Sequence, residues 1–291
     1  MIDFTNCPIL NRTYNGTNGS KISIIYNHET YMLKFPAIPS INKKMNHSNI
    51  SEYIGCHVFE SIGIPTQKTL LGTYCKNGKQ KIVVACKDFS ANGLALQDFA
   101  SLKNSIVDSV HNGYGTELDD ILKTLTEQQA IDSQLLNNRF WDMFIIDALI
   151  GNWDRHNGDW GFLYNIKTDK ILLAPIYDCG SCLFPRLDEE MMKDVLNKRA
   201  EIEIRIFEKP LSSIKINGKK IKYFDFISSL QNEDCNKALK RIVPKINLER
   251  IYKIIDKTPF ISDLQKEFYN TILMERKTKI LDFSYQKLNK E

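Results

Sequence analysis

A strongly apolar stretch, residues 127–150, runs directly into a segment dense in polar side chains, and this junction constrains the fold more than any other feature. The spacing of its apolar residues predicts one long helix, buried at the centre of the molecule. The segment that follows holds two carboxylates, Asp154 and Asp159, with an arginine, a histidine and an asparagine between them. Polar groups are costly to bury without partners. The cluster therefore needs a reason, and a functional site at the end of the central helix would supply one.

A third carboxylate, Asp178, follows an apolar strand-like run and precedes Gly180. Phosphoryl transfer requires one carboxylate that orients the attacking hydroxyl and accepts its proton, and a second acidic group that holds Mg²⁺ against the phosphates. Mg²⁺ takes few protein oxygens and completes its shell with phosphate oxygens and water. The order Asp154, Asp159, Asp178 meets that need. An alternative stays open in which Asp154 caps a helix or pairs with Arg155, and Asp178 only closes a turn.

The pattern of elements predicts an α+β fold. Strand-like runs at 22–26, 31–34, 69–75 and 81–86 surround a helix predicted from Ser51, as its N-cap, to Ile62. After Phe89 the pattern is mainly helical, with helices predicted at 117–125 and 127–150 and short strands at 162–164 and 171–173. Asn-Gly pairs at 77–78 and 217–218 are typical of hairpin turns. A small β-rich half and a larger helical half would enclose a cleft.

The chain has 291 residues, of which 43% are hydrophobic and 25% charged, as in an ordinary globular protein of one large domain or two lobes. Its net charge of +4 falls short of a dedicated nucleic-acid binder, so no direct nucleic-acid partner is expected. The basic residues are densest between 215 and 222, at Lys215, Lys219, Lys220 and Lys222. This patch is either a solvated surface or a docking site for an acidic partner or anionic surface.

Seven scattered cysteines, an odd number, indicate reduced thiols. The start of the chain has no signal-peptide pattern and no apolar run is long enough to span a bilayer, so no transmembrane segment is predicted. A cytoplasmic protein is expected, with export without a cleaved signal, or translocation into another cell, as the alternative.

The pair Cys179 and Cys182 has redox spacing, but neither a second such pair nor a thioredoxin-like context accompanies it.

The chain resembles the HipA-like serine/threonine kinases, and two short motifs carry the resemblance: D-R-H-N-G-D at 154–159 and D-C-G at 178–180. These sites are also similar to those of phosphatidylinositol 3- and 4-kinases. The chain lacks the extra amino-terminal subdomain of the HipA toxins and so looks more like the short, cell-translocating (CtkA) branch. The resemblance, from about residue 14 to 184, implies a two-lobed protein-kinase-like fold. Its small N-lobe would comprise residues 1–88 and its larger helical C-lobe residues 89–291.

The resemblance also implies how ATP is held. A loop whose backbone N–H groups cover the phosphates corresponds to Gly16, Thr17, Asn18, Gly19 and Ser20, because glycine permits close approach. Lys34 matches the strand lysine that contacts the phosphates, and Glu52 on the next helix is placed to pair with it. Adenine is expected at backbone atoms near Ala85 and Lys87, and the ribose at Asp88.

In the catalytic loop the resemblance assigns Asp154 as the base, with His156 beside it, and Asp178 as a metal ligand. The family usually has asparagine at the second metal position, where this chain has Asp159, and Asn157 is a nearby alternative ligand. His156 has a second interpretation as a histidine buried in the core. The expected cofactors are ATP and Mg²⁺, with Mn²⁺ as an alternative metal.

The implied activity is ATP- and Mg²⁺-dependent transfer to protein serine or threonine. Autophosphorylation is expected, with Ser20 as the candidate acceptor, since HipA-like kinases phosphorylate themselves in this loop. Two alternatives stay open: a phosphoinositide kinase, and a pseudokinase that binds nucleotide and acts as an interaction module. Asp159 is the feature that favours the second of these.

Overall fold

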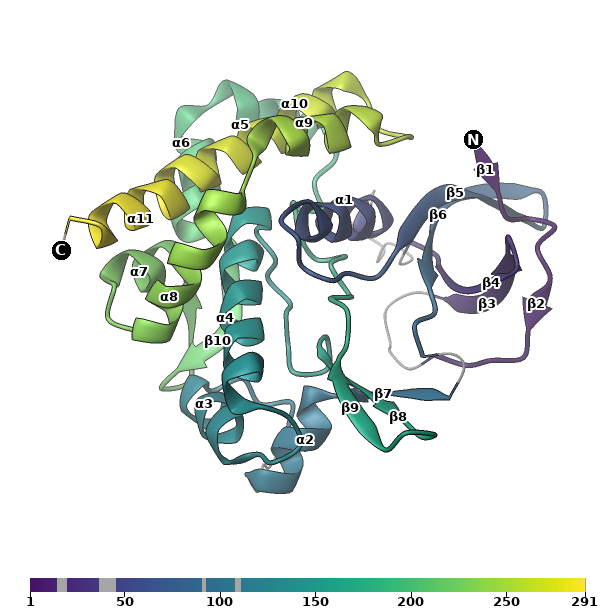
Figure 1. Cartoon of the computed structure of the whole chain (residues 1–291). Coiled ribbons are helices and arrows are strands. Elements are labelled where there is room, and N and C mark those ends of the chain that lie inside the picture. The colour runs from purple at the N-terminus through teal and green to yellow at the C-terminus, as the bar shows by residue number, and fades with distance from the viewer. Residues whose placement is uncertain (15–19, 37–45, 91–92, 108–110, 291) are drawn as a thin grey trace.

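The computed structural model describes residues 1–14, 20–36, 46–90, 93–107 and 111–290. It has a β-rich lobe and a larger helical lobe, seen on the right and left of Figure 1. The mixed α+β class and the two-lobed arrangement predicted from the sequence are therefore confirmed. The chain begins in the β-rich lobe and ends at the far side of the helical lobe.

The first lobe is built on a six-stranded sheet with the order β1-β5-β6-β4-β3-β2. Its strands are β1 (Ile2–Asp3), β2 (Ile9–Leu10), β3 (Lys21–Tyr26), β4 (Glu29–Lys34), β5 (Thr69–Lys76) and β6 (Lys79–Lys87). Among the described strands of this sheet, only β1 and β5 pair in parallel. Asn77 and Gly78 join β5 to β6 with φ of 52° and 72°, the left-handed backbone that favours Asn-Gly in a tight hairpin.

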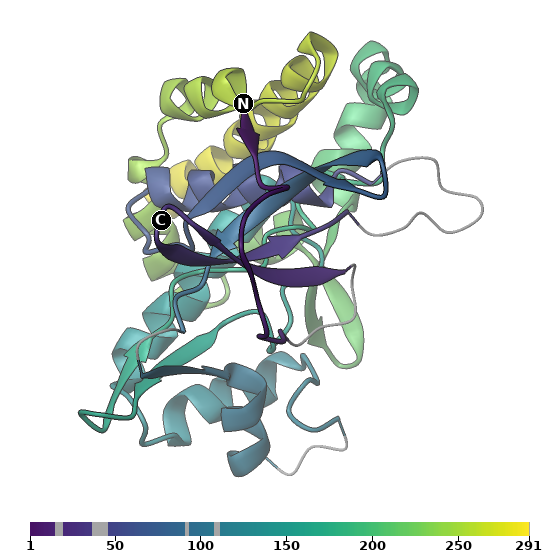
Figure 2. The same cartoon turned by 90° about the vertical axis from the view of Figure 1, so that its right-hand side faces the viewer.

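One helix, α1 (Ser48–Ser61), lies behind this sheet in Figure 2 and faces the other lobe in Figure 1. The prediction that Ser51 caps it is wrong. The helix begins one turn earlier, where the side chain of Asn46 accepts the N–H of Ser48 at 2.9 Å, and Ser51 is buried within it. The predicted end is confirmed, since the chain turns at Gly63 with φ of 88°.

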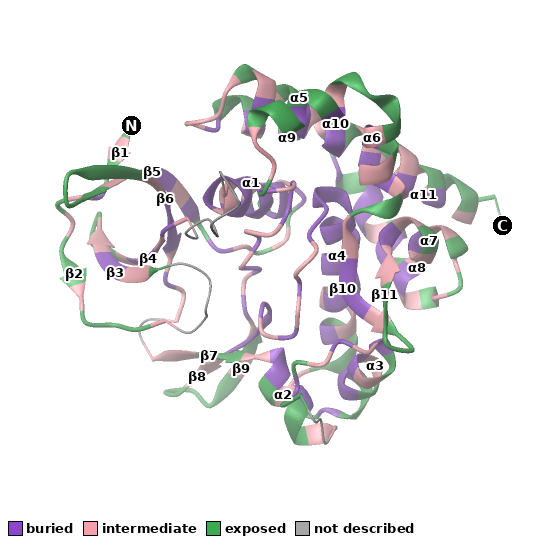
Figure 3. Ribbon diagram, turned by 180° about the vertical axis from the view of Figure 1, so that it is seen from behind, coloured by how far each residue is buried: buried purple, intermediate pink, exposed green. Residues whose placement is uncertain are grey.

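The predicted central helix is α4 (Ser133–Ile150), in which every residue from Met143 to Ile150 is buried (Figure 3). It is shorter than predicted, because the side chain of Gln128 accepts the N–H groups of Ala130 and Ile131 and breaks the helix there. The preceding helix is α3 (Leu118–Glu127). Asp132 then caps α4 by accepting the N–H of Leu135 at 2.7 Å.

The other elements of the helical lobe surround α4. Three short strands form a second sheet, β7 (Leu94–Asp98), β8 (Gly161–Asn165) and β9 (Lys170–Leu173), and β10 (Leu211–Ile216) pairs with β11 (Lys219–Lys222) as a hairpin. The α-helices are α2 (Phe99–Ile106), α5 (Glu189–Asn197), α6 (Arg199–Glu203), α7 (Tyr223–Ser229), α8 (Glu233–Ile242), α9 (Leu248–Lys257), α10 (Asp263–Arg276) and α11 (Phe283–Leu288). Short π- and 3₁₀-helical turns are η1 (Ile204–Glu208), η2 (Val243–Lys245) and η3 (Lys277–Asp282).

Candidate active site

Residues of both lobes line one cleft of about 830 Å³. From the β-rich lobe come Lys34 at the end of β4 and Glu52 on α1, and from the other lobe come all three carboxylates singled out in the sequence. Those carboxylates are Asp154, Asp159 and Asp178. The fold thus brings together groups that lie more than 140 residues apart in the chain, and it does so where a nucleotide-sized ligand has room.

Asp154 owes its position to the end of α4. Gly151 stops the helix in the left-handed conformation, with φ of 64°, and the chain leaves the core as a loop. The buried Asn152 then accepts the N–H of Asp154 at 3.3 Å and directs that residue toward the cleft. Partial burial raises the pKa of Asp154, and interactions with His156 first, and then with Lys220, oppose this rise.

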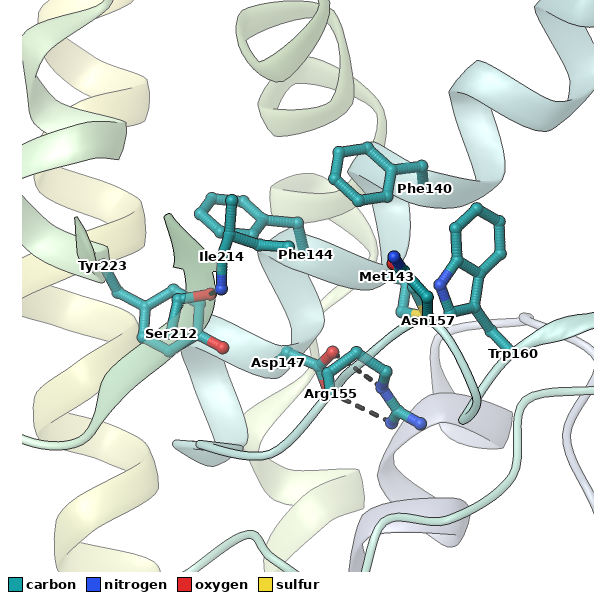
Figure 4. A pocket seen from close by; sticks show the side chains of 10 residues that line it. All are labelled: Phe140, Met143, Phe144, Asp147, Arg155, Asn157, Trp160, Ser212, Ile214 and Tyr223. Carbon is teal, nitrogen blue, oxygen red and sulfur yellow. Dashed lines mark hydrogen bonds and ion pairs between the residues drawn. The ribbon is translucent and has the colours of Figure 1, made fainter. Parts of the chain in front are cut away.

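Arg155 is a residue whose role the sequence did not indicate. It is buried beneath the loop and pairs with Asp147 of α4, with Nε to Oδ2 at 2.9 Å and Nη2 to Oδ1 at 3.2 Å (Figure 4). Its Nη1 donates to the main-chain carbonyls of Asp159, at 3.1 Å, and Asp178, at 3.3 Å. Burial alone would lower the pKa of Arg155, but Asp147 raises it well above the ordinary value. One guanidinium therefore ties the two acidic loops to the central helix.

A small cavity of about 10 Å³ lies beside this ion pair (Figure 4). Its walls include the rings of Phe140, Trp160 and Tyr223. It has room for about one water molecule and is separate from the large cleft. The cavity therefore lies beneath the loop that carries Asp154 and is too small for a nucleotide.

Lys34 joins the two lobes. Its Nζ lies 3.1 Å from Oε2 of Glu52 and 3.2 Å from Oδ1 of Asp178. Burial would lower the pKa of Lys34, but Asp178 and then Glu52 raise it well above its ordinary value. In return, Lys34 lowers the pKa of Asp178 to about 2. Asp178 adopts a left-handed backbone with φ of 58°, which few residues other than glycine adopt and which often marks functional positions.

Asp159 and Asn157 differ in where they point. Asp159 lines the cleft, whereas the amide of the buried Asn157 donates to the carbonyls of Gly113 and Gly115, both at 2.8 Å. The geometry therefore favours Asp159 over Asn157 as the partner of Asp178. Burial first, and then the charge of Asp178, raise the pKa of Asp159 well above its ordinary value.

His156 is exposed over 41% of its side chain and lines the cleft, so the interpretation as a core histidine is wrong. Its backbone N–H donates to Oδ2 of Asp159 at 3.1 Å, and its Nδ1 accepts the N–H of Gly158 at 3.1 Å. Both contacts hold the turn between the two carboxylates of the loop.

The donor set fits a hard divalent cation. The charge of Asp178 raises the pKa of Asp159, and a cation between the two carboxylates would relieve that repulsion. Among the described residues no group of three or more acidic, histidine or cysteine side chains has the arrangement of a complete metal site. Two carboxylates suffice for Mg²⁺, because phosphate oxygens and water complete its shell.

The predicted adenine contacts are less accessible than expected. Ala85 lies in the middle of β6, paired with Leu33 on one side and Leu70 on the other. The N–H of Lys87 donates to the carbonyl of Lys68 at 2.8 Å, and its own carbonyl accepts from Gln67 at 2.9 Å. The role of Ala85 and Lys87 in binding adenine therefore stays a prediction. The residues of this region that line the cleft are Val84, Asp88, Phe89 and Ser90.

Asp88, expected at the ribose, already has several partners. Its carboxylate pairs with Nε of Arg12 at 2.9 Å and accepts from the hydroxyl of Tyr14 at 2.9 Å and that of Ser90 at 2.8 Å. Arg12 and Tyr14, which the sequence did not single out, thus connect the start of the chain to the junction between the lobes.

Of the predicted phosphate loop, Gly16, Thr17, Asn18 and Gly19 lie outside the described residues. Ser20 is described and exposed, directly before β3.

Cys179 and Cys182 are both fully buried free thiols. Burial raises the pKa of Cys182 well above its ordinary value, which disfavours the redox interpretation of this pair.

Comparison with known proteins gives a consistent result. The model of the HipA-like C-terminal domain family matches residues 18–256. The serine/threonine-protein kinase CtkA of Helicobacter pylori strain J99 is 47% identical over 288 residues, which cover 98% of this chain and 87% of that protein.

Solved structures agree with this similarity. The crystal structure of a Helicobacter pylori proinflammatory kinase CtkA superposes with a TM-score of 0.94 at 46% identity, covering 99% of this chain and 98% of that one. The HipA, HipB and operator DNA complex of the Shewanella oneidensis toxin–antitoxin system contains a chain with TM-score 0.58 at 13% identity. That match covers 98% of this chain and 66% of the other, and shows a shared fold. No helix within the described part of the chain is long and apolar enough to cross a membrane.

Proposed function

The chain belongs to the HipA-like C-terminal domain family, and on that premise we propose that it is an ATP- and Mg²⁺-dependent protein serine/threonine kinase. The observation that carries the proposal is the convergence of Asp154, Asp159, Asp178 and Lys34 in one cleft formed by both lobes. The CtkA relative, a serine/threonine-protein kinase, supports the same reaction class.

Asp154 is the proposed base. Its carboxylate orients the substrate hydroxyl toward the γ-phosphate and accepts the proton as the oxygen attacks. Partial burial raises its pKa toward the working pH, which improves a general base so long as the group stays ionised. His156 supports the loop between Asp154 and Asp159 through its contacts with Asp159 and Gly158.

Lys34 is the proposed phosphate contact, with Glu52 holding it in place. Asp178 and Asp159 are the proposed ligands of Mg²⁺, and Mn²⁺ is the alternative ion. When bound, the metal neutralises charge on the phosphates, which is the main source of acceleration in this chemistry. Asp178 is ionised over the whole physiological range because Lys34 lowers its pKa to about 2. A ligand of this kind is ready for a cation without first losing a proton.

Autophosphorylation at Ser20 is part of the proposal. Ser20 is exposed and adjoins the loop expected over the phosphates. Mapping of phosphopeptides after incubation with ATP tests this assignment. Phosphate found only at other positions would remove Ser20, without affecting the assignment of the reaction.

The experiment that tests the function follows labelled γ-phosphate from ATP to the protein itself and to a generic acceptor such as myelin basic protein. Wild type is compared with Asp154→Ala and Asp178→Ala, in Mg²⁺ and in Mn²⁺, with Asp119→Ala on the exposed face of α3 as the matched control. Each of the first two variants should lose at least about 100-fold in rate, and the control should retain the wild-type rate.

A second function, a nucleotide-binding pseudokinase, is favoured by one observation, the acidic Asp159 at the second metal position. Wild type that transfers no phosphate to any acceptor, yet is stabilised by ATP, would favour that alternative or a phosphoinositide substrate. Absence of any effect of ATP would overturn both the kinase and the pseudokinase proposals.

A further inference from the structure

The β10–β11 hairpin and the residue that follows it form hydrogen bonds with the chain on both sides of Asp154. The hydroxyl of Ser213, on β10, donates to the carbonyl of Arg155, and the hydroxyl of Tyr223, just after β11, donates to the carbonyl of Asn152 at 2.6 Å. Figure 3 shows the hairpin beside α4. Charges on this hairpin therefore have a fixed position relative to the proposed base.

The hairpin carries cations that the fold does not neutralise. Lys215 and Lys220 are direct partners across the two strands, and like charges in that arrangement repel. Neither forms an ion pair with any described residue, whereas Lys222 pairs with Glu208 at 2.6 Å. The charge of Lys220 also acts at the cleft, since it lowers the pKa of Asp154. An anionic ligand bound at Lys215 and Lys220 would relieve the repulsion between these two lysines beside the proposed base.

A third cation reaches the same region from another element. Arg186 lies over the ring of Trp153, with its guanidinium carbon 4.9 Å from the ring centroid, and both residues line the cleft with Asp154. Stacking fixes the plane of a guanidinium and leaves its edge available for a carboxylate. Within the described part of the chain Arg186 has no ion-pair partner, and its side chain is exposed.

The acidic residues that follow Arg186 have another use. Asp188, Glu189 and Glu190 begin α5, where negative charge complements the helix N terminus. Asp188 also caps that helix by accepting the N–H of Met191 at 2.9 Å. These carboxylates therefore stabilise α5, and none of them forms an ion pair with Arg186.

We propose that Arg186, Lys215 and Lys220 form a subsite for acidic residues that flank the phosphoacceptor serine or threonine of a protein substrate. The inference rests on the proposed kinase function and adds the substrate class to it. Since the acceptor in that function is a protein hydroxyl, the anion beside it is a protein carboxylate. Lys215 and Lys220 of the basic patch are thus part of the proposed substrate site.

The test compares two peptides that are identical except that the residues flanking their single serine are glutamate in one and glutamine in the other. We expect wild type to have the higher kcat/KM for the glutamate peptide. Lys220→Gln and Arg186→Gln should each lower that preference by about threefold to fivefold, mainly through KM, and added salt should weaken it. Lys253→Gln, which removes an exposed lysine of α9 that has no described ion-pair partner, should leave the preference unchanged. A preference that both subsite variants retain in full would overturn the subsite.

A binding measurement separates this inference from the proposed function. Fluorescence anisotropy of the glutamate peptide with alanine in place of its serine reports the subsite without catalysis, and binding should weaken in Lys220→Gln and Arg186→Gln. Wild type that phosphorylates itself but shows no preference and no such binding would refute the subsite and leave the kinase standing. Wild type without any transfer would refute the kinase, while anisotropy would still decide the subsite.

A third measurement tests whether the protein binds vesicles that contain phosphoinositides. Binding to them that is lost in Lys220→Gln, with no effect on either peptide, would assign the cations to a lipid and overturn the proposal.

Discussion

At the scale of single residues, Arg155 does the most to fix the geometry of the site, because it contacts three separate parts of it. It pairs with Asp147 in the core and donates to carbonyls at the ends of both acidic loops. None of these contacts involves a group proposed to touch ATP. The sequence showed that Arg155 was polar and near a site, but it did not show that its partner would be Asp147, an acid inside the most apolar helix of the chain. Only the fold places the two together.

Replacing Arg155 with methionine should strongly destabilise the protein. The carboxylate of Asp147 would remain buried without its partner, a loss of about 3–5 kcal/mol in the free energy of unfolding. Urea denaturation measures this directly, and phosphate transfer should be lost under conditions where the variant is still folded.

The double variant Asp147→Leu, Arg155→Met is the control, because it removes both charges together. Apolar replacements of a buried pair are often neutral for stability, so the free energy of unfolding should recover in large part. Transfer should not recover, because the carbonyls of Asp159 and Asp178 still lack their donor. A double variant with wild-type transfer would show that Arg155 contributes stability and nothing more.

The pKa of Asp154 gives a prediction about pH. A base acts when deprotonated, so kcat/KM should rise with pH through that pKa, which partial burial raises above the ordinary value. Lys220 opposes the rise, so Lys220→Gln should raise the pKa further and move the acid limb of the profile to higher pH. The profile is measured with a peptide that lacks acidic residues, and Lys253→Gln serves as the control. A limb that stays in place, or moves to lower pH, contradicts the assignment of Asp154 as the base.

At the scale of elements, the strands of the β-rich lobe could be predicted because their signals are local. The turn residues Asn77 and Gly78, and the alternating pattern around them, lie within a few positions of the strands they connect. Strand β7 was missed because its partner is β8, more than 60 residues later, and neither alternation nor a turn marks it. The break before α4 was missed because Gln128, and not glycine or proline, makes it.

The helix α1 connects the lobes, and Gly55 is where it approaches the loop that follows Asp178. A Cβ at this position would lie 2.7 Å from Cβ of Cys179 and 3.0 Å from Sγ of Cys182. Gly55→Ala should therefore push α1 away and destabilise the fold by about 1–3 kcal/mol. Because Glu52 lies one turn earlier on α1, the Glu52–Lys34 pair should weaken and the rate of transfer should fall.

Thermal unfolding and transfer assays together measure the effect of Gly55→Ala. Glu60→Ala, at an exposed position of the same helix, is the control and should change neither quantity. A Gly55→Ala variant with wild-type stability would mean that α1 does not pack as closely on Cys179 as its backbone indicates.

At the scale of the whole molecule, the sequence predicted the two lobes and the cleft because the order of its motifs matches a known family. The boundary at residues 88 and 89 stays a prediction. Lys34, Glu52, Asp154 and Asp178, whose chemistry is distinctive, all line the cleft, and their roles there stay predictions. The partners of Lys87 and Asp88 could not be predicted from the sequence, because they depend on which backbone and side-chain groups the fold brings together.

Since both lobes line the cleft, a ligand that contacts both should stabilise the whole protein. Saturating ATP at about 100 times its dissociation constant would contribute about 2.7 kcal/mol, which a thermal-shift assay detects easily. With Mg²⁺ the increase in Tm should be larger, because Asp159 and Asp178 then bind the metal held by the phosphates. Asp178→Asn should retain most of the increase caused by ATP alone and lose the part added by Mg²⁺, whereas Asp119→Asn should retain both. Equal increases with and without Mg²⁺ in wild type would mean that the two carboxylates hold no metal, and would favour the pseudokinase over the kinase.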